Sequence, residues 1–287
     1  MTHSRWLKLL SLSSAFVVSA CAADMDGTDP TDTSADTTNA HIMPLRNPDA
    51  PAPAVTANAI AGLTFFGGPI LSKIDIHPVF WNSATKLQSN INAFYAAMPS
   101  SALYSMLSQY NIGTAGSAVA GIVDTNATRS IKDSAIQSRL TTLINQGKLP
   151  APTANTYYPV HFPSGMTISL GSSRSCVQFC AYHSTFVLNG VNVNYGVVPD
   201  IGQKGCSGGC GASNVTNNTD SVSSHELVEA TTDPAVGLAT TFAFPLGWYD
   251  QPDNQEIGDL CNAQQGTSAG FTVQKEWSNA ANACVDH

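Results

Sequence analysis

The chain has 287 residues, enough for one large domain or two small ones, and a formal net charge of −8. Only 11% of the residues are charged, and the 12 lysines and arginines form no run, which argues against a nucleic-acid-binding protein. The polar surface must therefore come from Ser, Thr, Asn and Gln.

The first residues predict export. Two basic residues precede a short, mostly apolar stretch, residues 9–20, which is too short to anchor the chain across a bilayer. Residues 18–21, Val-Ser-Ala-Cys, resemble the cleavage motif of bacterial lipoproteins, in which the cysteine becomes the lipidated first residue. We expect a signal peptide over residues 1–20 and a lipid on Cys21 that holds the protein at the membrane surface of the bacterial envelope. The alternative is ordinary cleavage at a nearby small residue, with Cys21 lost or free.

The cysteine count agrees with export. Seven cysteines are an odd number, and setting Cys21 aside leaves six. In an oxidising compartment these six can form three disulfides, with fifteen possible pairings left open. A structural zinc site is the alternative for the two Cys-x-x-x-Cys pairs. The six cysteines are Cys176, Cys180, Cys206, Cys210, Cys261 and Cys284.

Residues 21–58 are rich in Asp, Thr, Ala and Pro and have no apolar period, so we expect a lipidated, disordered tether. The remainder, residues 59–287, is predicted to be a single α+β domain. Apolar spacing predicts strands and helices in its first half. Strands are expected at 63–66, 70–81, 118–123, 157–162 and 167–170, and helices along the apolar stripe 87–98, at 102–110 and from Ser130, where Asp133 would complete a capping box.

The second half contains a clear hairpin signal. Asn189-Gly190 lies between two β-rich runs and predicts a hairpin over 184–198 with a two-residue turn. Residues 202–211 are expected to form a loop whose glycines make room for disulfides. A helix is predicted at 221–232, capped by Asp220 or Ser221 and ended by Pro234. Mostly loop is expected after Pro234.

This helix carries the pattern His225-Glu226-Leu227-Val228-Glu229. Positions i and i+4 share one helix face, so His225 and Glu229 point the same way, with Glu226 beside them. The geometry is that of the His-Glu-x-x-His zinc-hydrolase helix with Glu in place of the second His. The chain has only four glutamates, which makes a chance occurrence improbable.

A hydrolytic zinc site needs about three protein ligands and a carboxylate base, so a third ligand must come from elsewhere. Glu256 and Asp259 follow about thirty residues later and are the leading candidates; the alternative is a capped turn next to a cysteine. Asp233 lies two helical turns after His225, and its alternative is a helix-ending Asp-Pro turn. His183 is a candidate second nitrogen ligand or catalytic group that polarises a substrate carbonyl, the alternative being a buried structural histidine.

Several blocks together resemble the phosphate-induced, EXORDIUM-like extracellular proteins of plants and their bacterial relatives. The resemblance rests on Phe66-Gly67-Gly68-Pro69-Ile70-Leu71, Val79-Phe80-Trp81, Cys176-x-x-x-Cys180-Ala181-Tyr182-His183, residues 224–234, residues 247–250 and residues 256–261. It implies an exported cell-surface protein with a zincin-like metal helix. Plant members are associated with cell-wall growth and signalling, without an agreed reaction.

We therefore expect a disulfide-stabilised, zincin-like α+β fold in which a mixed or antiparallel sheet packs against helices. The expected function is a zinc-dependent hydrolase resembling a metallopeptidase, acting on a protein, peptide or cell-wall substrate. His225, Glu229 and Glu256 or Asp259 would hold the metal, and Glu226 would be the base. Calcium is the alternative ion, and a non-catalytic surface or wall-binding protein the alternative function.

Overall fold

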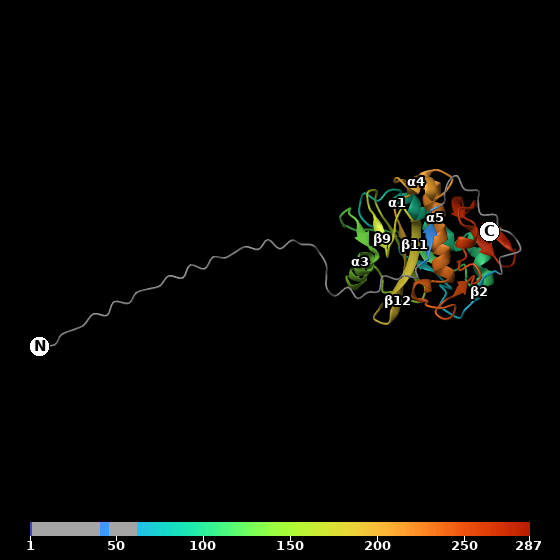
Figure 1. Cartoon of the computed structure of the whole chain (residues 1–287), viewed down its shortest axis with the longest axis horizontal. Coiled ribbons are helices and arrows are strands. Elements are labelled where there is room, and N and C mark those ends of the chain that lie inside the picture. Colours follow the sequence, from blue (N-terminus) through green and yellow to red (C-terminus); the bar gives the residue numbers. More distant parts are fainter. Residues whose placement is uncertain (2–40, 46–61) are drawn as a thin grey trace. The chain divides into compact units, whose positions relative to one another are not determined.

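The computed structural model describes residue 1, residues 41–45 and residues 62–287 (Figure 1). All of these except Met1 belong to one compact unit, Ser34–His287. Apart from Met1, the predicted signal peptide lies outside the described residues, as do Cys21 and most of the predicted tether. Within the described ranges, no helix is both long and apolar enough to cross a bilayer.

The helices are few and mostly short. They are α1 (Gln88–Ala97), α2 (Ala102–Met106), α3 (Asp133–Asn145), α4 (Cys206–Gly209) and α5 (Val215–Thr232), with the 3-10 turns η1 (Met98–Ser100), η2 (Leu107–Tyr110), η3 (Val236–Leu238) and η4 (Asp259–Cys261).

The principal sheet is mixed and has eight strands among the described residues, in the order β1-β11-β12-β8-β3-β5. In addition, β4 pairs with β8, and β6 pairs with β4. The long hairpin β11–β12 is antiparallel, whereas β12, β8, β3 and β5 run parallel. Its strands are β1 (Ile42–Pro44), β3 (Asp75–Ile76), β4 (Val79–Phe80), β5 (Ser117–Ala118), β6 (Ile122–Val123), β8 (Thr156–His161), β11 (Phe179–Leu188) and β12 (Val191–Val198).

Smaller sheets complete the fold. Two of the two-stranded sheets lie wholly in the region after Pro234 that was predicted to be mostly loop, and a third pairs a strand of that region with β2. Their strands are too short and irregular in pattern for the spacing of apolar residues to reveal them. The smaller sheets pair β2 (Thr64–Phe65) with β13 (Trp248–Tyr249), β14 (Gln265–Ser268) with β15 (Phe271–Gln274), β16 (Glu276–Ser278) with β17 (Ala283–Val285), and β9 (Ile168–Leu170) with β7 (Ile131–Lys132) and β10 (Ser173–Arg174).

Helices cover the sheet on two sides, with α5 on one side and α3 on the other (Figure 1). Alternation along β8 places Tyr157 in the core with α5 and Tyr158 in the core with α3. The same alternation on β11 turns Tyr182 toward α3 and His183 away from it. The predicted α+β class with a mixed sheet is confirmed.

The predicted hairpin is also confirmed, since Asn189 and Gly190 connect β11 to β12 and both have positive φ.

Two helix starts differ from expectation. Helix α5 begins at Val215 rather than near Ser221, because the side chain of Asn214 accepts the backbone N–H of Asn217 and caps the helix earlier. Helix α3 begins at Asp133, whose carboxylate accepts hydrogen bonds from tyrosines of the sheet instead of closing a capping box.

Residues 41–45 correct the predicted tether. Residues 42–44 form β1, which pairs antiparallel with β11, and Met43 is buried. This apolar stretch is too short to stand out from the polar composition of the surrounding segment. It forms a strand because it pairs with β11, which lies far along the chain.

Three disulfides join Cys176 to Cys206, Cys180 to Cys210 and Cys261 to Cys284. The first two tie the start of β11 and the residues just before it to α4 and the residue that follows it, so these cysteines are not a structural zinc site. The third ties η4 to β17.

We expect that replacing Cys261 and Cys284 together with serine lowers the free energy of unfolding by about 3 kcal/mol, because the bond closes a loop with a sequence separation of 23. Urea denaturation of the oxidised proteins measures this change. An equal midpoint for the variant and the wild-type protein would contradict the expectation.

Candidate metal centre

Helix α5 supplies the first two groups of the site. His225 and Glu229 lie one turn apart on the same face, with Nε2 of His225 3.1 Å from Oε2 of Glu229. Both side chains are fully buried because α5 is packed between β11 and β12 on one side and β15 on the other. Nδ1 of His225 is held by the amide nitrogen of Gln274 at 2.6 Å, which sets the direction of the ring.

The segment that follows β13 and runs into η4 supplies two carboxylates, Glu256 and Asp259. The backbone N–H of Asp259 donates to Oε1 of Glu229 at 3.1 Å, which ties this segment to α5. Gly258 allows the approach: a Cβ atom there would lie 2.5 Å from Nδ1 of His225 and 2.8 Å from Oε1 of Glu229. A larger residue at position 258 would displace the side chains of His225 and Glu229, so the close approach of this segment to the site depends on glycine there.

The sheet supplies two histidines. Nε2 of His183, on β11, lies 3.2 Å from both carboxylate oxygens of Glu256 and 3.8 Å from Oε2 of Glu229. His41, just before β1, places Nδ1 3.4 Å from Oδ2 of Asp259, and its Nε2 lies 2.6 Å from the hydroxyl of Tyr249. The sequence patterns did not identify His41 as a site residue. The one local feature that could have pointed to it is the apolar Ile-Met pair that follows it within a polar segment.

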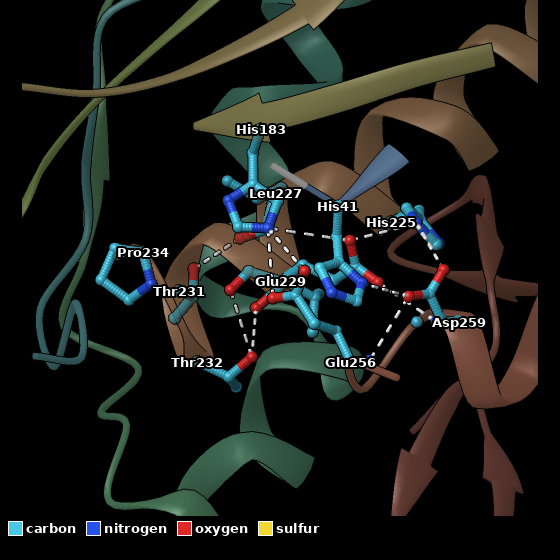
Figure 2. Close-up of polar contacts among 12 residues, drawn as sticks. His41, His183, His225, Leu227, Glu229, Thr231, Thr232, Pro234, Glu256 and Asp259 are labelled. Carbon is cyan, nitrogen blue, oxygen red and sulfur yellow. Dashed lines mark hydrogen bonds and ion pairs between the residues drawn. The ribbon is translucent and has the colours of Figure 1, made fainter. Parts of the chain in front are cut away.

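These side chains converge on one buried region (Figure 2). Three overlapping groups hold their candidate ligand atoms within 4.8 Å of one another. Each group has one histidine and two carboxylates, and each carboxylate belongs to two groups. The groups are His183 with Glu229 and Glu256, His225 with Glu229 and Asp259, and His41 with Glu256 and Asp259.

The spacing suits a small metal ion. A tetrahedral ion with bonds of about 2.0–2.2 Å separates its ligand atoms by about 3.3–3.6 Å. The distances from His183 to Glu256 (3.2 Å) and Glu229 (3.8 Å), and from His225 to Glu229 (3.1 Å), lie close to this range. Nε2 of His225 faces Glu229 without a well-aligned hydrogen bond, as expected of an atom directed at a common centre.

The cluster has no basic partner in the described part of the chain. The ion pairs that lysine and arginine form there, Lys86–Asp200 and Arg139–Asp124, involve none of its residues. Burial raises the pKa of Glu256, and the charge of Glu229 adds to the effect. Burial also raises the pKa of Glu229 itself, partly offset by His225. Buried carboxylates without a fixed cation are costly, and a bound metal ion would neutralise them.

The pKa values of His183 and His225 are shifted in opposite directions. Burial lowers the pKa of His183 to about 3, and the charges of His41 and His225 act in the same sense. Burial also opposes a charge on His225, but Glu229, Glu226 and Asp259 together outweigh burial and raise the pKa of His225 above its usual value. A neutral His183 is the form that binds a metal.

Two residues predicted for the site lie outside all three groups. Glu226 is fully buried, and neither of its carboxylate oxygens has a hydrogen-bond partner in the described structure. Burial raises the pKa of Glu226. The charge of His225 lowers it, and the charge of Glu229 raises it further. Asp233 ends α5 and accepts the backbone N–H of Gly247 at 2.8 Å, which are the contacts of a helix-ending turn.

We expect the metal-free protein to lose stability as pH rises from about 6.5 to 8.5. Burial raises the pKa of Asp233 to about 8, so the folded chain keeps a proton that the unfolded carboxyl has already lost. The raised pKa of His225 acts in the same direction, whereas the lowered pKa of His183 has its effect below 6.5. Each extra proton held costs about 1.4 kcal/mol per pH unit.

Chemical denaturation in a chelator at several pH values measures this slope. With zinc added, stabilisation by the metal should instead grow with pH, because its ligands bind in their deprotonated forms. A metal-free protein that is more stable at the upper end of this range than at the lower end would contradict the expectation.

Comparison with models of protein families, with curated proteins and with solved structures finds no match to this chain. The resemblance to EXORDIUM-like proteins therefore stays a prediction.

Proposed function

We propose that the buried cluster binds a zinc ion and that the protein is a metal-dependent hydrolase resembling a metallopeptidase. The observation that carries the proposal is a set of three histidines and three carboxylates, gathered from four separate segments, with no lysine or arginine paired to it in the described chain. Such a set is expensive to bury unless a cation neutralises it.

His183, His225, Glu229 and Glu256 would hold the metal, with Asp259 as a further carboxylate. Imidazole nitrogens suit zinc and related transition metals, whereas calcium takes oxygen ligands, so the histidines favour zinc over calcium. A zinc ion here would act as a Lewis acid and lower the pKa of a water molecule. Glu226 would accept the proton released, since its buried carboxylate has no hydrogen-bond partner to satisfy.

We further propose that the protein is exported and held at the bacterial membrane surface by a lipid on Cys21, as a bacterial relative of the EXORDIUM-like proteins. Three disulfides support an oxidising compartment. The substrate would be a protein, a peptide or a cell-wall component.

A second function is favoured by the closure of the cluster. His183, His225 and Glu256 are fully buried, and His41 lies next to the partly exposed Asp259, so the cluster is largely enclosed in this arrangement. A non-catalytic surface or wall-binding protein with a structural metal would have this closed form.

The test is to measure metal content by mass spectrometry and hydrolysis of an unstructured protein, before and after chelation and after zinc is restored. One equivalent of zinc and zinc-dependent hydrolysis are expected. Zinc without hydrolysis would support the second function, and a fully folded protein that binds no metal would overturn both.

A further inference from the structure

The edge of the principal sheet beside the metal cluster is covered by residues of the same chain. In the described structure β11 has β12 on one side and only the three residues of β1 on the other. Their register pairs Ile42 with Tyr182 and Met43 with Ala181, antiparallel. Without β1, this part of β11 would present unpaired backbone groups, which an extended peptide can satisfy.

The short strand is seated as a peptide ligand is, by alternating side chains. Met43 is 3% exposed and packs in a small core with Ala181 and Cys180, whereas Pro44 points outward and is exposed. Met43 is the most deeply buried side chain of this segment. Ile42 and Leu45 pack against the core at its edge, and His41 contacts Asp259 and Tyr249.

His41 lies on the more exposed side of the cluster, next to Asp259. The register places His41 one residue beyond Ile42, beside His183 on β11 (Figure 2). The side chains of His183, His225 and Glu256 are 0% exposed, whereas those of His41 and Asp259 are 21% and 11% exposed. Solvent therefore approaches the cluster from the side that His41 covers.

A cavity adjoins this strand. Its volume is about 420 Å³, and it is lined by His41 and Ile42 together with both polar and apolar side chains that follow α5. Val236 and Leu246 form part of the wall, and Phe242 at the rim is exposed. A cavity of this size and mixed lining has room for a side chain of a ligand lying along β11.

We propose that the edge of β11 is the binding site for an extended polypeptide, and that residues 41–45 occupy it as an internal copy of that ligand. Backbone pairing with β11 would position the ligand, and an apolar residue in the place of Met43 would anchor it. Displacement of β1 removes His41 from the cluster and opens it. The peptide would be a substrate only if the proposed function holds, and to that extent this inference rests on the proposed function. Binding of the peptide itself requires no metal.

The test uses the full chain and a fluorescent synthetic peptide with the sequence of residues 38–47, followed by fluorescence anisotropy. In the wild-type protein the internal strand competes at a high effective concentration. The variant Met43→Asp would release the strand, because a buried carboxylate has no partner there. We expect the variant to bind the peptide at least tenfold more tightly than the wild-type protein does.

Two controls are matched to this comparison. A peptide that itself carries Asp in place of Met43 should not bind to either protein, and the protein variant Pro44→Asp, altered at an exposed position of β1, should bind like the wild-type protein. Near-ultraviolet circular dichroism and a count of the disulfides establish folding. Should Met43→Asp fail to fold, Met43→Ala removes packing without burying a charge and is expected to give intermediate binding.

Equal binding of both peptides, or no gain over the wild-type protein in a folded Met43 variant, would overturn the inference. The assay is run in a chelator and again with zinc. Peptide binding by a protein that binds no zinc would support this inference and remove the proposed function. Zinc-dependent hydrolysis without the gain in peptide binding would support the proposed function and overturn this inference.

Discussion

Replacing Glu256 with glutamine is expected to lower the affinity for zinc by at least about 100-fold. Both carboxylate oxygens of Glu256 lie 3.2 Å from Nε2 of His183, and Glu256 belongs to two of the three candidate ligand groups. A neutral amide keeps the shape of the side chain but removes the negative charge that attracts the ion. Competition with a chromophoric chelator measures the affinity.

Glu276→Gln is the matched control for this variant. Glu276 is also a fully buried glutamate without a hydrogen-bond partner in the described structure, and burial raises its pKa, but it belongs to none of the three groups. It should therefore retain the affinity of the wild-type protein. The same loss in both variants would mean that general burial of charge, rather than ligation, determines metal binding.

Replacing Glu226 with glutamine is expected to reduce kcat by about 10²- to 10⁴-fold while the zinc content stays unchanged. Glu226 follows His225 on α5 but lies outside the ligand groups, so its loss should remove a proton acceptor and no metal contact. The substitution also removes a buried carboxyl that has no partner, so the folded protein should be no less stable. Steady-state hydrolysis, zinc analysis and thermal denaturation are measured on the same preparation.

The three glutamate variants separate the roles. Glu256→Gln should lose both metal and hydrolysis, Glu226→Gln hydrolysis alone, and Glu276→Gln neither. Unchanged hydrolysis in Glu226→Gln would exclude this residue as the base, and loss of zinc in that variant would instead make it a ligand.

Part of the site was predictable from local pattern. The spacing of His225 and Glu229 determines their common face, because a helix repeats every 3.6 residues, and Pro234 ends that helix wherever it packs. The scarcity of glutamate pointed to Glu256, which the structure brings next to His183. Asp233 also has the spacing to reach the same face, yet it is taken up by the backbone of Gly247.

The sequence by itself determined the α+β class, the Asn189-Gly190 hairpin and the helix that carries the metal pattern, since each depends on neighbours within a few residues. Only the tertiary structure decided which distant groups join that helix. The disulfide pairing, the close approach at Gly258 and the place of His41 depend on segments up to 218 residues apart, for which local periodicity carries no information. The burial that makes uncompensated charge in the cluster costly is likewise a property of the packed sheet and helices.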